Sequence, residues 1–276
     1  MPIRQFRLRD EFGNSQFGGG GSGIASSLPP NPRGIMDFDG VSDYLERDGG
    51  FTGVSDSGNF FFSMFGRFLG ADNNWSSQFC DYGANFLYVA RNPSNLFQVY
   101  VGSTNGNNLS FDTSSGAVAS SGWWHLAVSL SLGTSIQKIQ ARLNDVNVYS
   151  GTSFNTWPSG GDTINFTSAI NWFIGAGVLG LNKHNGFAAE IYMNMGGSFI
   201  DLDITANRRK FLRSNGTPAV LGASGEKPTG TPPTLYLSTT PGGSSADFRT
   251  NKGSGGGMFE VGALTSVFQD IVVPMP

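Results

Sequence analysis

Cysteine and charged residues are both scarce in this chain of 276 residues. Cys80 is the only cysteine, which excludes a disulfide within the chain and any zinc site built from several thiolates. Charged residues make up 13% of the sequence and the formal net charge is -3, so no basic surface is available to neutralise nucleic-acid phosphates. We therefore expect stability to come from packing, and we expect no nucleic-acid partner.

A long hydrophobic run is also missing. Residues 1–16, MPIRQFRLRDEFGNSQ, contain basic residues but no apolar stretch of the kind found in signal peptides. No window of the chain approaches the roughly 18 uncharged apolar residues of a membrane-spanning helix. The sequence therefore predicts neither a signal peptide nor membrane insertion.

Glycine and phenylalanine are abundant instead. The 40 glycines and 23 phenylalanines favour many turns between short apolar strands over amphipathic helices rich in Ala, Glu, Lys and Leu. From Gly34 onward, short apolar runs recur between turn signals such as Asn105-Gly106 and Ser150-Gly151. We expect an all-β meander or jelly-roll sandwich, and a single main domain, because all-β sandwiches of this length commonly form one domain.

The start of the chain differs in character from the rest. GGGGSG, residues 18–23, is followed by IASSLPPNPRG, and neither composition sustains a regular element. We interpret residues 1–33 as a flexible N-terminal arm and a possible anchor. Residues 34–276 are interpreted as the β-sandwich domain together with a C-terminal extension.

Two local elements can be placed from their own signals. In residues 137–151, QKIQARLNDVNVYSG, apolar residues alternate on one side if Asn144-Asp145 supplies a turn, which predicts a hairpin with one buried face. Residues 203–216, DITANRRKFLRSNG, are the one expected helix. Asp203 or Thr205 can cap it and Gly216 can end it in the left-handed conformation.

Several motifs occur in the order of a known fold. Five of them, over roughly residues 34–194, resemble the successive strands of the concanavalin A-like, laminin-G-type jelly roll. They are MDFDGVSDYL, SGWWHLAVSL, RLNDVNVYSG, INWFIGAG and NGFAAEIYMN. Residues 207–238 and 251–264 resemble the C-terminal extension that a subgroup of such domains carries in phage and prophage virion proteins. The resemblance implies an all-β, laminin-G-like jelly-roll sandwich with one short helix.

Three aspartates surround a glycine in GIMDFDGVSDYL, residues 34–45, which suggests either a metal site or a turn. In folds of the resembled kind this segment is a first strand running into a turn, whose aspartates accept backbone N–H bonds. We favour the turn, because a calcium site needs roughly six oxygen ligands and the spacing is not that of an EF-hand. The candidate calcium ligands are Asp37, Asp39 and Asp43.

A β-glucanase of this fold needs two carboxylates on one strand face, a nucleophile and a general acid on either side of the scissile bond. Glu190 is followed at the alternating positions by Tyr192 and Asn194, so that arrangement is absent. Asp201 and Asp203 do alternate, but they directly precede the expected helix, where a capping role is favoured.

A nucleophilic triad is not indicated either. His125 lies in a strand motif, where an edge or core histidine bonded to the backbone is expected, and His184 lies in an expected surface turn. Cys80 is expected to be a buried, inert thiol on an apolar strand. We predict no enzymatic activity and no cofactor.

Two tryptophans lie in loops rather than in strands. Trp75 and Trp157 are surrounded by Asn, Ser, Gly and Pro, so an exposed indole could stack on a sugar ring while Asn73, Asn74 or Asn155 donates hydrogen bonds. The alternative is that each indole covers the end of the core or a neighbouring subunit.

These observations lead to three functional hypotheses. The first is a non-enzymatic virion structural protein of a tailed phage, a capsid decoration, fibre or tail component made in the host cytoplasm. Its arm would bind other virion proteins, and homo-oligomers are expected because closed symmetry covers exposed strand edges. The second is a carbohydrate-binding module for host attachment, and the third is a β-glucanase that depends on Glu190.

Overall fold

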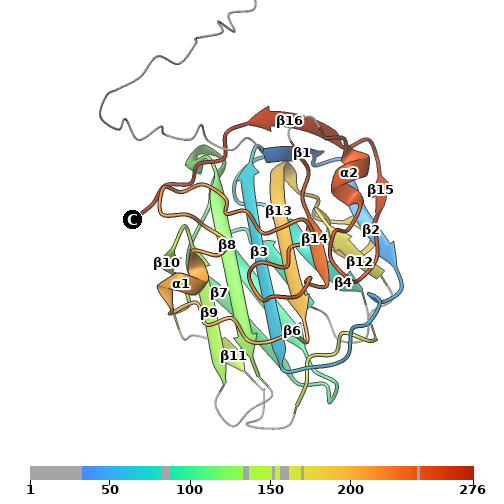
Figure 1. Ribbon diagram of the computed structural model, residues 1–276, viewed down its shortest axis with the longest axis vertical. Coiled ribbons are helices and arrows are strands. Elements are labelled where there is room, and N and C mark those ends of the chain that lie inside the picture. Colours follow the sequence, from blue (N-terminus) through green and yellow to red (C-terminus); the bar gives the residue numbers. More distant parts are fainter. Residues whose placement is uncertain are drawn as a thin grey trace, which may run out of the picture.

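Two antiparallel sheets of eight strands each form the body of the protein (Figure 1). The computed structural model describes residues 33–82, 87–132, 137–150, 153–155, 162–168, 171–240 and 243–276. Sheet A has the order β10 (Val146–Asn147), β9 (Lys138–Leu143), β8 (Trp124–Ser131), β3 (Asn59–Phe68), β13 (Asn185–Met195), β1 (Arg33–Asp39), β16 (Thr265–Gln269), and β14 (Leu235–Leu237) also pairs with β13. Sheet B has the order β11 (Ser153–Asn155), β7 (Asn108–Gly116), β6 (Leu96–Gly102), β5 (Leu87–Arg91), β4 (Ser76–Tyr82), β12 (Asn171–Ile174), β2 (Tyr44–Asp48), β15 (Phe259–Val261). The expected all-β sandwich is confirmed.

The core lies between the two sheets, and sheet A is also buried on its outer side. In β3, Phe60 and Phe62 face the main core, whereas Phe61 and Phe65 belong to two further apolar clusters. A strand that is covered on both faces is expected to be apolar along its whole length, which explains the continuous run in NFFFSMFGRF.

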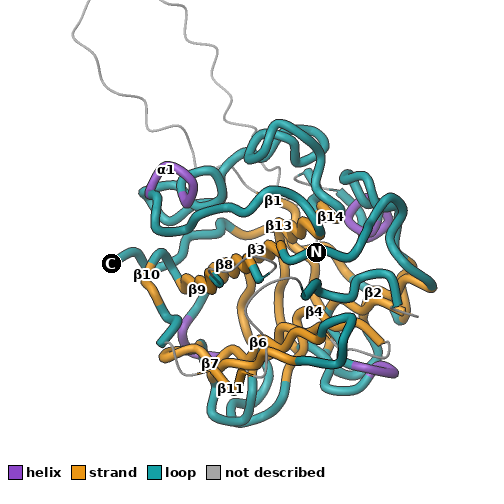
Figure 2. Tube along the Cα trace, turned by 90° about the horizontal axis from the view of Figure 1, so that it is seen from below, coloured by secondary structure: helices purple, strands orange, loops and turns teal. Residues whose placement is uncertain are grey.

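Residues 196–276 supply the outer cover of sheet A. Phe61 of β3 and Tyr192 of β13 pack against Phe211 from this C-terminal segment, with ring centroids 4.6 Å and 5.1 Å from that of Phe211. Figure 2 shows these loops lying over the sheet that contains β8, β3 and β13, on the side away from sheet B. The same segment adds β14 and β16 to sheet A and β15 to sheet B, so it is part of the sandwich.

The helical content differs from the expectation. Helix α1 spans only Thr205–Arg208, and its N-cap, Ile204, has no side-chain cap. A second short helix, α2 (Ser245–Arg249), was not expected and is capped by the Ser244 side chain, which accepts a bond from Asp247 N. The predicted helix over residues 203–216 is therefore too long, because the Asp203 carboxylate is engaged elsewhere and the chain after α1 turns back in an isolated bridge.

The hairpin of β9 and β10 turns at Asn144-Asp145, as predicted. Both residues have positive φ, 50° and 70°, as a tight two-residue hairpin turn requires. Val148 is buried but Val146 is 46% exposed, so not every apolar residue of the hairpin lies on the buried side. The predicted arm, residues 1–33, lies outside the described residues except for Arg33, which begins β1.

In the part of the chain that the structure describes, the first two strands pair only with strands from the second half of the sequence. Strand β1 lies between β13 and β16, and β2 lies between β12 and β15. Each of these pairings joins segments that are more than 120 residues apart in the chain.

Candidate functional site

The acidic side chains considered for catalysis, Glu190, Asp201 and Asp203, are all engaged by other side chains of the protein. Glu190 sits at the irregularity in the pairing of β13 with β3, has a φ of 49° and is 2% exposed. Its carboxylate accepts hydrogen bonds from Tyr236 Oη at 2.8 Å and from Ser238 Oγ at 2.6 Å. Glu190 thus holds the C-terminal segment against the sheet.

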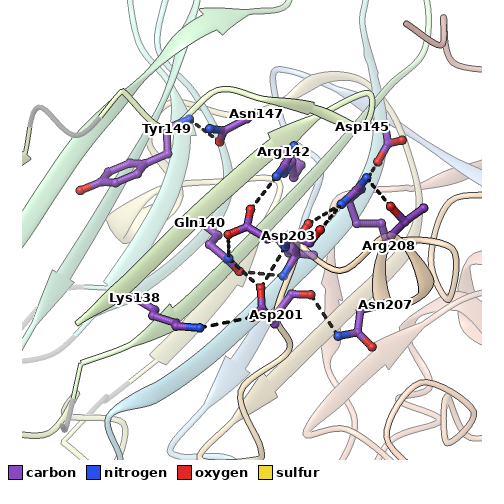
Figure 3. A network of polar contacts seen from close by, with 12 residues as sticks. Lys138, Gln140, Arg142, Asp145, Asn147, Tyr149, Asp201, Asp203, Asn207 and Arg208 are labelled. Atoms are coloured by element: carbon purple, nitrogen blue, oxygen red, sulfur yellow. Dashed lines mark hydrogen bonds and ion pairs between the residues drawn. The ribbon is translucent and has the colours of Figure 1, made fainter. Parts of the chain in front are cut away.

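Asp201 and Asp203 bind side chains of β9 instead of capping α1 (Figure 3). Gln140 Nε2 donates to Asp201 Oδ1 at 2.9 Å and to Asp203 Oδ2 at 2.8 Å. Lys138 and Arg142 lie on either side of Gln140 and form ion pairs with Asp201 and Asp203, respectively. The predicted capping role is wrong, because the alternating polar side chains of β9 offer these carboxylates charged and amide donors.

Asp145 extends this network at the hairpin turn. Its carboxylate oxygens accept bonds from Arg208 Nε at 2.5 Å and from Arg209 Nη2 at 2.6 Å, and its side chain is only 6% exposed. The contacts in Figure 3 therefore fasten the α1 segment to the edge of sheet A.

The two histidines are both buried. His125 Nε2 lies 2.9 Å from Ser63 Oγ, so the expected core position is confirmed, although this ring contact is to a side chain. His184 is 0% exposed, with Nδ1 3.2 Å from Ser76 Oγ, and burial lowers its pKa to about 4. The predicted surface turn for His184 is wrong, because the rings of Phe38 and Phe68 close over it.

The aspartates of the first turn use their oxygens within the protein. Asp39 Oδ1 accepts bonds from the backbone N–H groups of Val41, Ser42 and Asp43 at 2.8–2.9 Å. Asp43 Oδ1 accepts a bond from Ala263 N at 2.8 Å. No group of three or more His, Cys, Asp or Glu side chains in the described residues is placed to hold a metal ion. This geometry favours the turn interpretation.

The outer face of sheet B is less covered than that of sheet A. One row of residues crosses it in register, with their side chains on the side away from the core. It consists of Phe173, Cys80, Tyr88, Tyr100 and Ser110. Cys80 is buried, as expected, and burial raises the pKa of its thiol to about 12, so the thiolate is disfavoured.

Trp75 stands at the edge of this face, directly before β4, and is 38% exposed. The loop before it is fixed by a reciprocal amide contact: Asn73 N donates to Asn95 Oδ1 at 2.9 Å, and Asn95 Nδ2 donates to Asn73 Oδ1 at 3.0 Å. Asn73 thus orients the loop, while Asn74 and Trp75 line the surface beside it.

Two hollows meet at Trp75. The polar hollow, of about 470 Å³, is lined by Asn74, Trp75, Arg91, Asn182, Lys183, Asn185 and four small residues. The apolar hollow, of about 300 Å³, is lined by Trp75, Ser77, Cys80, Tyr88, Ala90, Gly177, Val178, Leu181 and Asn182. Both volumes fall within or close to the range of small-molecule sites, which are mostly apolar with a few fixed polar groups.

A single loop, residues 175–184, contributes to the lining of both hollows. Gly177 N donates to Leu181 O at 2.6 Å, and Ser77 N of β4 donates to Asn182 O at 2.8 Å. Leu181 is 63% exposed although it lines the apolar hollow. Exposed apolar side chains beside a hollow are typical of a binding surface.

Arg91 is the buried charged residue that lines the polar hollow. It is 2% exposed, its guanidinium lies 4.0 Å from the centre of the Phe68 ring, and Nη1 forms an ion pair with Asp72 at 3.1 Å. Burial lowers the pKa of Arg91, partly offset by Asp72. Arg91 therefore fixes the loop that carries Trp75 rather than offering a free charge.

Of the remaining predicted sugar contacts, Asn155 lies in β11, which three strands separate from β4 in sheet B. Trp157 lies outside the described residues. Sequence reasoning missed Tyr88, Leu181 and Asn182. The alternation in LYVAR gave a signal for Tyr88, but LNKHNG gave none for the other two.

A scan against models of protein families and a search of curated proteins each found no match to this chain. A search of solved structures found a Bacteroides ovatus protein of proposed carbohydrate-binding function, with a TM-score of 0.51 and 12% identity over 89% of this chain and 62% of that one. Domains LG4-5 of the mouse laminin α1 chain match with a TM-score of 0.41 and 11% identity, over 62% of this chain and 44% of that one. A heptameric SAP-like pentraxin from Limulus polyphemus matches with a TM-score of 0.41 and 9% identity, over 58% and 75%.

These likenesses concern the fold. With identities of 9–12%, they carry no argument about ligands, and of these three structures the Bacteroides protein alone has a TM-score above 0.5. This chain spans about three fifths of that protein, 62% of its length. The chain has the expected concanavalin A-like, laminin-G-like jelly-roll fold.

Among the helices of the described residues, none combines the length and the apolar character that a membrane span requires.

Proposed function

We propose that this chain binds carbohydrate, with the sugar ring stacked on the Trp75 indole. The observation that carries the proposal is the position of Trp75, partly exposed between a polar and an apolar hollow. A pyranose has an apolar C–H face and a rim of hydroxyl groups. It is therefore suited to an aromatic ring beside amide side chains such as Asn74 and Asn182.

The test is binding to a glycan array, followed by titration of the best glycan into the protein. Replacing Trp75 by Ala removes the stacking surface and should weaken binding at least about tenfold, or about 1.4 kcal/mol. Leu179→Ala is the matched control, because Leu179 is 72% exposed and lines neither hollow. An array without hits, or equal affinity of the Trp75 and Leu179 variants, would overturn the proposal.

The proposed role is non-enzymatic. What supports this is the engagement of the acidic side chains considered for glucan hydrolysis: Glu190 is buried against Tyr236 and Ser238, and Asp201 and Asp203 are bound to β9. Glycoside hydrolysis needs two carboxyl groups that face one bond. Release of reducing sugar from a β-glucan that is lost in Glu190→Gln would contradict this and support a β-glucanase.

The setting we propose is the virion of a tailed phage, in which the chain is a homo-oligomeric surface component of the capsid or tail. Its support is the resemblance of residues 207–238 and 251–264 to virion-associated domains, together with the integration of these residues into both sheets. Residues 1–33 are the proposed attachment to other virion proteins. Deleting them should abolish incorporation into particles, and normal incorporation would contradict this role.

A further inference from the structure

The walls of the two hollows beside Trp75 differ in chemistry. Asn74, Lys183 and Asn185 face the polar hollow, whereas Val178, Leu181 and the Tyr88 ring face the apolar hollow. Trp75 and Asn182 line both, so the hollows are adjacent parts of one surface. A ligand that fills both must be rich in hydroxyl groups at one end and carry an apolar group at the other.

We infer that the ligand is a sugar bearing an N-acetyl group, whose methyl enters the apolar hollow while its hydroxyl groups face the polar hollow. This inference rests on the proposed function and narrows the class of glycan. An unsubstituted hexose has hydroxyl groups around its whole rim, so it would bring one of them against Val178 and Leu181 without a partner. An acetamido group instead places a methyl there.

The amide of the ligand needs hydrogen-bond partners at the boundary between the hollows, and Asn182 lies at that boundary. A side-chain amide offers both a donor and an acceptor, which matches the C=O and N–H of an acetamido group. Asn182 has a φ of 49°, and its backbone oxygen accepts a bond from Ser77 N at 2.8 Å, so its position is tied to β4.

The apolar hollow is formed before a ligand arrives. Tyr88 is held by its stack on Tyr100, and the loop that carries Val178 and Leu181 is closed by the bond from Gly177 N to Leu181 O. Lys183 Nζ donates to Gly180 O at 2.5 Å, which fixes the same loop from the polar side. A preformed hollow discriminates between ligands because little of the binding free energy is spent on ordering.

The test compares matched sugars by titration followed with NMR of the labelled protein. The methyl glycosides of N-acetylglucosamine and glucose form one pair, and those of N-acetylgalactosamine and galactose form the other, each differing in an acetamido or hydroxyl group. The better N-acetyl sugar should bind roughly tenfold tighter than its partner, since a buried methyl and one amide hydrogen bond each contribute. Binding of this sugar should shift the protein resonances of the Trp75 indole and of the Leu181 methyl groups.

Leu181→Asn should reduce the preference for the acetamido group to about twofold or less while weak binding to the hexose persists. Leu179→Asn is the control, because it is an exposed leucine of the same loop that lines neither hollow, and it should keep the preference. Thermal melts of both variants establish that they are folded. Equal binding of both members of each pair would overturn the inference while the proposed function stands. No binding of any sugar, here or on the array, would overturn both.

Discussion

Tyr88 and Tyr100 form a cross-strand pair on the outer face of sheet B, with ring centroids 5.3 Å apart and planes 7° from parallel. Tyr88 Oη donates to Gln98 Oε1 at 2.5 Å, and Gln98 Nε2 donates to Asp112 Oδ1 at 3.0 Å. Burial raises the pKa of Tyr88 to about 12, with smaller effects from Tyr100, Cys80 and Asp112. The hydroxyl of Tyr88 is therefore neutral and committed to Gln98, and its ring forms a fixed wall of the apolar hollow.

Replacing Tyr100 by Ala should loosen that wall. The ring stack contributes about 1 kcal/mol beyond the buried area, so we expect the free energy of unfolding to fall by about 1–2 kcal/mol and glycan affinity to fall several-fold. Denaturant unfolding and titration measure the two effects. Tyr100→Phe is the matched control and should behave like the parent, because the ring is retained. An Ala variant as tight-binding as the Phe variant would show that the stack does not support the hollow.

Asp81 should make stability depend on pH in the direction opposite to a salt-bridged carboxylate. It is 0% exposed, Oδ1 accepts a bond from Leu87 N at 2.5 Å, and burial raises its pKa to about 7. Between about pH 4 and pH 7 the unfolded chain loses this proton and the folded chain keeps it. The contribution of Asp81 therefore destabilises the fold increasingly as pH rises through this range.

Asp81→Asn mimics the protonated acid and keeps an acceptor for Leu87 N. It should raise the free energy of unfolding at pH 8 by roughly 2–4 kcal/mol and change it little at pH 4. Thermal or urea unfolding at the two pH values measures the difference. A variant that is no more stable than the parent at pH 8 would mean that the carboxyl is ionised in the folded protein at lower pH.

Asp145 should be a main attachment of the α1 segment to sheet A. Burial opposes its ionisation, but the bonds and charges of Arg209 and Arg208 outweigh burial and lower the pKa of Asp145. Its contribution is therefore present above about pH 4, the unfolded value, and is lost as pH falls through the lower folded pKa.

Asp145→Ala leaves two arginines without their shared acceptor and should cost about 2–4 kcal/mol of stability. Asp203→Ala is the control, because its side chain is 70% exposed, and an exposed ion pair contributes about 1 kcal/mol or less. Hydrogen exchange should increase over residues 200–213 in the Asp145 variant. Equal hydrogen exchange over these residues in the two variants would mean that Asp145 is not a main attachment of the α1 segment.

Asp39 should behave as a turn residue in solution. Asp39→Ala removes one oxygen that accepts three backbone N–H bonds and should cost about 1–2 kcal/mol, whereas Asp39→Asn retains an acceptor and should cost less. Unfolding in denaturant distinguishes the two. Adding calcium should leave the melting temperature unchanged, and a rise that disappears in Asp39→Asn would instead support the calcium site.

Local patterns sufficed for features that neighbouring residues determine. The turn at Asn144-Asp145 follows from residues that tolerate positive φ between two alternating runs. The exposure of Trp75 and the burial of Cys80 follow from their polar and apolar surroundings in the sequence. These are interactions within a few residues, so the sequence carries them directly.

Features made by distant segments were missed. His184 lies in a polar stretch but is buried by Phe38 and Phe68, which precede it by more than 100 residues. The apolar hollow joins Tyr88 of β5 to Leu181 of the β12–β13 loop, and no periodicity links them. Asp203 matched a capping pattern, but its carboxylate accepts hydrogen bonds from Gln140 and Arg142 of β9. Two charge-assisted hydrogen bonds stabilise the carboxylate more than one capping bond does.

The pairing of β1 and β2 constrains how the chain can fold during synthesis. Their partners lie at residues 171–195 and 259–269, so the chain must be synthesised beyond residue 269 before both neighbours of each strand are available. Until then the apolar strands β1 and β3 lack their covers, which favours slow folding after translation and makes the nascent chain prone to aggregate. A chaperone that shields these segments would therefore raise the yield of native protein more than it would for a fold assembled from local contacts.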